Sequence, residues 1–303
     1  MILLTDHTFR TVAACAALIG ITSGALGSFA VLRKESLQGD CVSHATLPGI
    51  VIAFLLTESG RPEHLLPGAF LTGLAAIAAV ACITKRSRLP FDSALALVMA
   101  VFFGLGLVLL SASAAHPAAT QAALNRFIYG QAAAALTRDI QVTAATAAVL
   151  LFALLLFWKE CKLLAFDPAF AKAMGLHTGL FHTILNLLTV CAIVIGLQTV
   201  GAILMSAMLA APAAAARQWT NRLETMTVLS AAFGAAAGVA GVAAGALIPG
   251  LPTGPAIVVC AAGFAIASLL FAPARGVLPR FCKAKRRQGE SGHANQDGRV
   301  SPR

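Results

Sequence analysis

Residues 225–274 read TMTVLSAAFGAAAGVAGVAAGALIPGLPTGPAIVVCAAGFAIASLLFAPA and contain no Asp, Glu, Lys or Arg. A helix that spans a bilayer needs about 20 predominantly apolar residues, so this stretch is long enough for two such helices. The uncharged segment 249–255 is rich in Pro and Gly and is expected to form the turn between them. Because the apolar residues do not alternate with a period of two, the pattern favours membrane helices over a transmembrane β-barrel.

Similar apolar runs extend over most of the chain. Residues 173–216 also lack Asp, Glu, Lys and Arg, and the whole sequence is 58% hydrophobic and only 11% charged, whereas soluble domains carry about 25% charged residues. We therefore predict an all-α, polytopic helical membrane protein with roughly eight or nine transmembrane helices. Two segments are ambiguous: residues 112–139 can be a loop, an interfacial helix or a further span, and residues 180–216 can be a single helix or a tight pair. The candidate spans are roughly 12–32, 42–57, 65–84, 93–111, 140–158, 180–198, 201–216, 227–247 and 255–272.

The basic residues indicate the orientation of the chain. The net charge is +10, and Lys and Arg cluster in the short loop 85–88 and after the last span at 283–287. Such clusters are typical of cytoplasmic segments, so we expect a multi-pass protein of the cell (inner) membrane with a cytoplasmic C-terminus. The charge then requires no nucleic-acid partner. We expect residues 1–279 to form the transmembrane domain and residues 280–303 a basic, disordered cytoplasmic tail.

The strongest functional signal is the pair Asp40 and His44, which are four residues apart at the start of an apolar run. On a helix, residues at this spacing share one face. A carboxylate and an imidazole are suitable ligands for a divalent ion such as manganese, iron or zinc. Ionisable groups at membrane depth are energetically expensive, and they therefore indicate function. The pair predicts a metal-ion pathway through the membrane.

The segment 159–178 predicts a short helix between two spans on the cytoplasmic side. Asp167 is placed to cap the helix, Pro168 to occupy its first position and Gly175 to end it. Such a helix is a natural docking element for a soluble partner, although an ordinary interfacial helix has the same composition. The candidate docking residues are Asp167, Pro168, Phe170, Lys172 and Gly175.

Other polar residues have less specific interpretations. We expect His182 to be packed or interfacial, and Glu63, His64 and His116 to be solvated on loops, while His177 carries no functional signal. The pairs Gly20/Gly24, Gly234/Gly238 and Gly241/Gly245 predict close helix packing, and Asn186, Gln198 and Ser206 predict hydrogen bonds between helices. Asp92 is a candidate cap for the fourth span. The cysteines show no zinc or disulfide spacing and are expected to be mostly small buried side chains: Cys15, Cys41, Cys82, Cys161, Cys191, Cys260 and Cys282.

Taken together, these segments resemble the membrane permease subunits of the zinc/manganese/iron family of ABC importers, over about residues 15–278. The matching motifs are GSFAVLR (27–33), GDCVSHATLPG (39–49), FFGLG (102–106), LAFDPAFA (164–171), QTVGAIL (198–204), APAAAAR (211–217) and PTGP (252–255). Cys41 departs from the small residue expected at its position. One step from Asp40 turns it about 100° away on a helix, so direct ligation by its thiol is not expected.

The resemblance implies a permease, not an enzyme, that forms a homodimer or heterodimer and binds two cytoplasmic ABC ATPase subunits. It implies that an extracytoplasmic binding protein delivers the metal, that Asp40 and His44 belong to the metal path, and that the Asp167–Gly175 helix docks on the ATPase. The chain lacks GxxxxGK[ST], so the ATPase must be a separate subunit. No cofactor is expected to be bound permanently, because the divalent ion (manganese, zinc or iron) is the transported substrate.

Three alternatives remain open at the level of sequence. A permease for a metal chelate, such as haem or a siderophore, would favour a wide neutral cavity over a paired Asp and His. An intramembrane hydrolase could use Asp40 and His44, but the chain has no HExxH motif and no convincing nucleophile. A passive channel would not need the docking helix. Asp and His serve all three metals, so the sequence does not choose among manganese, zinc and iron. The sequence around residues 198–222 resembles manganese permeases slightly more.

Overall fold

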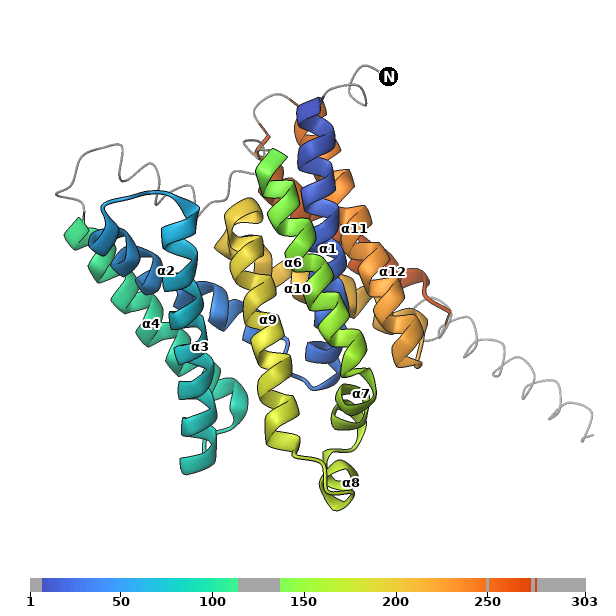
Figure 1. Ribbon diagram of the computed structural model, residues 1–303. Coiled ribbons are helices and arrows are strands. Elements are labelled where there is room, and N and C mark those ends of the chain that lie inside the picture. The colour runs from blue at the N-terminus through green and yellow to red at the C-terminus, as the bar shows by residue number, and fades with distance from the viewer. Residues whose placement is uncertain (1–6, 114–136, 249–250, 274–275, 277–303) are drawn as a thin grey trace, which may run out of the picture.

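The structure, a computed structural model, describes residues 7–113, 137–248, 251–273 and 276. Every regular element within these residues is an α-helix (Figure 1). The helices are α1 (His7–Leu32), α2 (Gln38–Thr57), α3 (Pro62–Arg86), α4 (Phe91–Ser113), α6 (Thr137–Leu156), α7 (Trp158–Phe166), α8 (Pro168–Ala173), α9 (Thr178–Val200), α10 (Ala202–Trp219), α11 (Leu223–Leu247) and α12 (Thr253–Phe271).

Within the described residues, seven helices are long and apolar enough to cross a membrane, or up to eight if a bent pair counts as one span. That pair is α6 and α7, which meet at an angle of 67°. The expected all-α membrane fold is confirmed. The uncertain segment 112–139 falls mainly in residues 114–136, outside the described part, as do the predicted tail 280–303, His116 and Cys282.

The helices form two groups on either side of α9 and α10 (Figure 1). On one side, α2 packs against α3 and α4, and on the other side α1 packs against α11, which also contacts α12. One end of the bundle carries α7, α8, the α3–α4 turn and the α10–α11 turn, and we call it the α8 end. The N-terminus lies at the opposite end (Figure 1).

The glycine pairs bring α1 and α11 into backbone contact. A Cβ atom built on Gly20 would lie 2.2 Å from the carbonyl oxygen of Gly234, so no larger side chain fits without separating the helices. One turn further on, the Ser230 hydroxyl donates a hydrogen bond of 2.6 Å to the Gly24 carbonyl. The close packing that the glycine spacing predicts is therefore present in the structure.

The structure corrects one predicted helix boundary, at the start of α4, and defines another, between α9 and α10. Asp92 is not the cap of α4: the helix begins at Phe91, because the Pro90 carbonyl already accepts the Ala94 N–H at 3.1 Å. Asp92 instead lies in the first helical turn, where its charge complements the helix dipole. The spans predicted at 180–198 and 201–216 are two helices, separated at Gly201, whose φ of +89° interrupts the helical path.

Candidate functional site

The structure places Asp40 and His44 side by side on the first two turns of α2. His44 Nε2 lies 3.5 Å from Asp40 Oδ1, which is longer than a good N–H···O hydrogen bond of about 2.7–3.2 Å. Two ligands of one tetrahedral ion with bonds of about 2.0–2.1 Å would lie about 3.3 Å apart. The two atoms are thus spaced as ligands of a shared ion would be. Their side chains are 40% exposed for Asp40 and 24% for His44, so both are accessible in the single chain.

Neighbouring helices hold this pair in place. Ser206 of α10 makes a side-chain hydrogen bond to the Asp40 carboxylate, and the His44 ring meets the Phe103 ring of α4 edge to face, with centroids 4.9 Å apart. The two contacts come from different helices and fix the directions of the two side chains. The prediction that Ser206 makes a hydrogen bond between helices is confirmed. The side chain of Gln198 lies outside the described part of the structure.

The pair lies deep within the bundle. Ser206 is thirteen residues from Trp219, the residue at which α10 reaches the α8 end. At a rise of about 1.5 Å per residue, Ser206, the partner of Asp40, lies about 20 Å along α10 from that residue. Asp40 takes this position because α2 starts at Gln38, part-way through the bundle, after a connection that turns back inwards (Figure 1).

Cys41 faces away from the pair, as its position on the helix predicts. It is 1% exposed and packs among Ala45, Ala76 and Leu95. Cys15 and Cys161 are buried as well, whereas Cys191 and Cys260 are partly buried. Cys82 is an exception to the expected burial, because it is exposed on the face of α3 that lines a cavity.

The short helix at 167–175 forms as the sequence predicts. Asp167 Oδ1 accepts the Phe170 N–H at 2.9 Å, Pro168 is the first residue of α8, and Gly175 follows the helix with φ of +81°. Phe170 is 53% exposed at the α8 end of the bundle, although it is a large apolar residue. Lys172 is exposed in the last turn. The helix therefore presents apolar and basic side chains to a partner, and its docking role stays a prediction.

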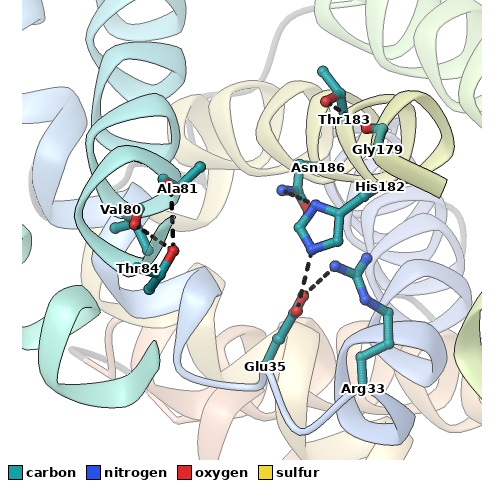
Figure 2. Close-up of polar contacts among 9 residues, drawn as sticks. All are labelled: Arg33, Glu35, Val80, Ala81, Thr84, Gly179, His182, Thr183 and Asn186. Carbon is teal, nitrogen blue, oxygen red and sulfur yellow. Dashed lines mark hydrogen bonds and ion pairs between the residues drawn. The ribbon is translucent and has the colours of Figure 1, made fainter. Parts of the chain in front are cut away.

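His182 belongs to a polar cluster that sequence reasoning did not find. Its Nε2 lies 3.4 Å from Glu35 Oε1, and its Nδ1 lies 3.1 Å from Asn186 Nδ2. Glu35 also forms an ion pair with Arg33 at 2.6 Å. Figure 2 shows these four side chains converging from the α1–α2 connection and from α9. His182 thus makes polar contacts with two partners, which the expectation of a packed or interfacial residue did not include.

A cavity of about 880 Å³ lies beside this cluster, between α3 and α9. Its lining includes Thr84 on α3, which faces the cluster in Figure 2, and His182 and Asn186 on α9. Lys85 and Arg86, at the α8 end of α3, also line the cavity. At its inner end it includes Gln38, two residues before Asp40. The cavity therefore connects the α8 end of the bundle with the first turn of α2.

Comparison with known proteins identifies the family of the chain. Residues 5–272 match the model of the ABC 3 transport family. The chain belongs to the ABC 3 transport family. It is 46% identical to the zinc transport system membrane protein TroC of Treponema pallidum, over 94% of this chain and 96% of TroC. It is 42% identical to the manganese transport system membrane protein MntC of Bacillus subtilis, over 89% of this chain and 62% of MntC.

The architecture also matches a solved structure. PsaBC from Streptococcus pneumoniae, solved in complex with Fab, aligns with a TM-score of 0.80 and 32% identity, covering 93% of this chain and 97% of that chain. The ABC 3 transport family membership agrees with the resemblance seen in the motifs. The matched range contains α8, the Asp40/His44 pair and the His182 cluster.

Several expected loop residues of this ABC 3 transport protein are placed differently by the structure. Glu63 and His64 lie in the first turn of α3, because Pro62 starts that helix, and both are exposed. His177 is exposed just before α9. Within the described residues, no three or more His, Cys, Asp and Glu side chains converge into a group that could hold a metal ion. A metal site built from Asp40 and His44 thus needs ligands from elsewhere.

Proposed function

We propose that this chain is the permease subunit of an ABC importer that carries a divalent metal ion, manganese, zinc or iron, across the cytoplasmic membrane. The observation that carries the proposal is the Asp40/His44 pair, spaced at 3.5 Å and held by Ser206 at a point about 20 Å along α10 from Trp219. A carboxylate and an imidazole at this depth serve an ion better than a large neutral chelate. The names of TroC and MntC support zinc and manganese as substrates.

The two ligands of one chain become four in a dimer. Two protomers around a two-fold axis that passes beside α2 would bring together two Asp40 carboxylates and two His44 imidazoles. The two carboxylates balance the charge of one divalent ion, and neutral imidazoles complete a four-coordinate site. A heterodimer with a sister permease that carries the same pair would work equally well. A site with few ligands also releases its ion, as transport requires.

The α8 end is the proposed contact with two cytoplasmic ATPase subunits. There α8 presents Phe170 and Lys172, and α7 is tied to the core by the ion pair between Lys162 and Glu224 of α11. A displacement of α8 on ATPase binding would therefore be transmitted through α7 to α11. ATP hydrolysis occurs in the separate subunit, so this chain is not itself the enzyme.

The distribution of basic residues supports a cytoplasmic α8 end. Lys85 and Arg86 end α3, and Arg217 and Arg222 flank the α10–α11 turn at the same end (Figure 1). This agrees with the excess of Lys and Arg on cytoplasmic loops. We propose the same cytoplasmic side for the C-terminus, in keeping with the basic residues at 283–287. The opposite end then receives the metal from an extracytoplasmic binding protein, and ATP-driven alternating access opens the Asp40/His44 site to one side at a time.

The proposal is tested by metal content in cells that lack this chain. Manganese, zinc and iron are measured by mass spectrometry after complementation with the wild type, Asp40→Ala or His44→Ala at equal membrane levels. We expect the wild type to restore one metal and both variants to fail. His64→Ala, which changes an exposed histidine in the first turn of α3, is the matched control and should restore uptake. Full restoration by Asp40→Ala and His44→Ala would refute the assigned metal path.

A further inference from the structure

The Glu35/His182 cluster repeats the chemistry of the Asp40/His44 pair nearer the α8 end. Both combine one carboxylate with one imidazole, and both have an N···O separation of 3.4–3.5 Å. That separation is long for a hydrogen bond and close to the spacing of two ligands on one ion. His182 lies in the second turn of α9, about 6 Å along the helix from its start at the α8 end. The cluster is therefore displaced from Asp40 towards the cytoplasmic side.

We propose that Glu35 and His182 form a second coordination site, at which a divalent metal ion pauses between Asp40/His44 and the cytoplasm. The inference rests on the proposed function for the direction of transport, but binding at the site can be measured separately. Glu35 Oε1 and His182 Nε2 are the two principal ligands, and the cavity of about 880 Å³ supplies space for the ion and its remaining water ligands.

The surroundings of the cluster contain polar atoms without partners. Asn186 and Gln38 both line the cavity and are only 7% and 2% exposed. Asn186 Oδ1 and Gln38 Nε2 have no hydrogen-bond partner. Buried polar groups are nearly always satisfied, so two orphaned amides beside one cavity indicate that something polar occupies it.

Asn186 also sets the orientation of the histidine. With the amide as drawn in Figure 2, Asn186 Nδ2 donates to His182 Nδ1 at 3.1 Å, so the imidazole proton resides on Nε2 and points to Glu35. Rotating the amide by 180° would let Nδ1–H donate to the orphaned Oδ1 and would free the Nε2 lone pair. A histidine that binds a metal through one nitrogen normally donates its other N–H in this way. One amide flip therefore prepares His182 to bind a cation.

Arg33 gives the site a means of release. Its guanidinium is paired with Glu35 at 2.6 Å and competes with an incoming cation for the same carboxylate. Lys85 and Arg86 make the mouth of the cavity positive, so a cation would not accumulate beside them. Glu35 and His182 attract the ion, while the neighbouring positive charges repel it. The site therefore binds the ion weakly enough to release it.

The test uses the purified full-length chain in lipid nanodiscs, with Co²⁺ as a spectroscopic probe. In the Asp40→Asn/His44→Gln background, we expect a remaining class of Co²⁺ sites with visible absorption bands, and we expect His182→Gln to abolish them. His177→Gln, five residues earlier and exposed, is the matched control and should leave the bands unchanged. Arg33→Gln should tighten Co²⁺ binding by about tenfold or more, because it removes the competing charge.

Two results would overturn the inference. One is the absence of Co²⁺ binding in the Asp40→Asn/His44→Gln background up to on the order of 1 mM. The other is binding that is indifferent to both His182→Gln and Glu35→Gln. Failure of the proposed function gives a different pattern, because the wild-type chain would then leave cellular metals unchanged while the His182-dependent Co²⁺ bands persist. A structural role of His182 alone would lower thermal stability without any His182-dependent Co²⁺ absorption.

Discussion

The contact between α1 and α11 makes a quantitative prediction about stability. In Gly20→Ala, the new Cβ would lie 2.2 Å from the Gly234 carbonyl oxygen, whereas real Cβ contacts are essentially never under 3.0 Å. The backbones must therefore separate by about 0.8 Å. Overpacking of this kind costs about 1–3 kcal/mol, and weakening the Ser230–Gly24 hydrogen bond costs about 1 kcal/mol more. The better helix propensity of Ala returns about 1 kcal/mol, which leaves a net destabilisation of about 2 kcal/mol.

Gly263→Ala is the matched control for this change. Gly263 is exposed on α12, and a Cβ built there meets nothing within 4 Å, so only the gain in propensity of up to about 1 kcal/mol remains. The two variants should thus differ by about 3 kcal/mol. The assay is the apparent melting midpoint of each purified variant, measured at one heating rate in the same detergent. If Gly20→Ala melts at or above Gly263→Ala, the backbone contact does not limit stability and the reasoning is wrong.

Three further changes are predicted. Asp167→Ala removes the cap of α8, which is worth about 1 kcal/mol, and should reduce co-purification of the ATPase several-fold. Asp167→Asn keeps the cap and should keep most of the assembly. Equal loss of the ATPase in both variants would contradict a capping role. Ser206→Ala removes the hydrogen bond to Asp40 and should raise the KM of metal uptake a few-fold at unchanged membrane level. A maleimide should modify exposed Cys82 well before Cys41, as followed by mass spectrometry of peptides, and the reverse order would contradict the packing of α2.

The local features of the fold could be predicted from the sequence because neighbouring residues cause them. The cap at Asp167, the proline at position 168 and the glycine at 175 act within one or two helical turns, and the structure shows all three. The spacing of Asp40 and His44 likewise fixes their shared face. The boundary at Asp92 was predicted wrongly because the helix starts at Phe91, with Pro90 in the cap position, two residues earlier than a side-chain cap at Asp92 would place it.

The Glu35/His182 cluster could not be found in this way, because 147 residues separate its two principal members and only tertiary packing brings them together. One local signal was available. Arg33, Lys34 and Glu35 are three consecutive charges between apolar runs, only a few residues before Asp40, and charges at such a position are costly without a role. The depth of Asp40 was also inaccessible, since it depends on the inward return of the α1–α2 connection and not on composition.

That inward return has an electrical consequence for the unloading of cargo. Because α2 begins at Gln38 inside the bundle, its amino-terminal end lies beside Asp40, and no side chain of Leu37 caps it. Such an end carries about half a positive elementary charge. In the proposed dimer, two of these ends would face one divalent ion and raise its energy relative to the same ligands placed in the middle of a helix. The helix ends would then lower the affinity of the site for the ion. ATP binding would therefore have to open the site to one side of the membrane, and it would not have to overcome tight binding of the metal.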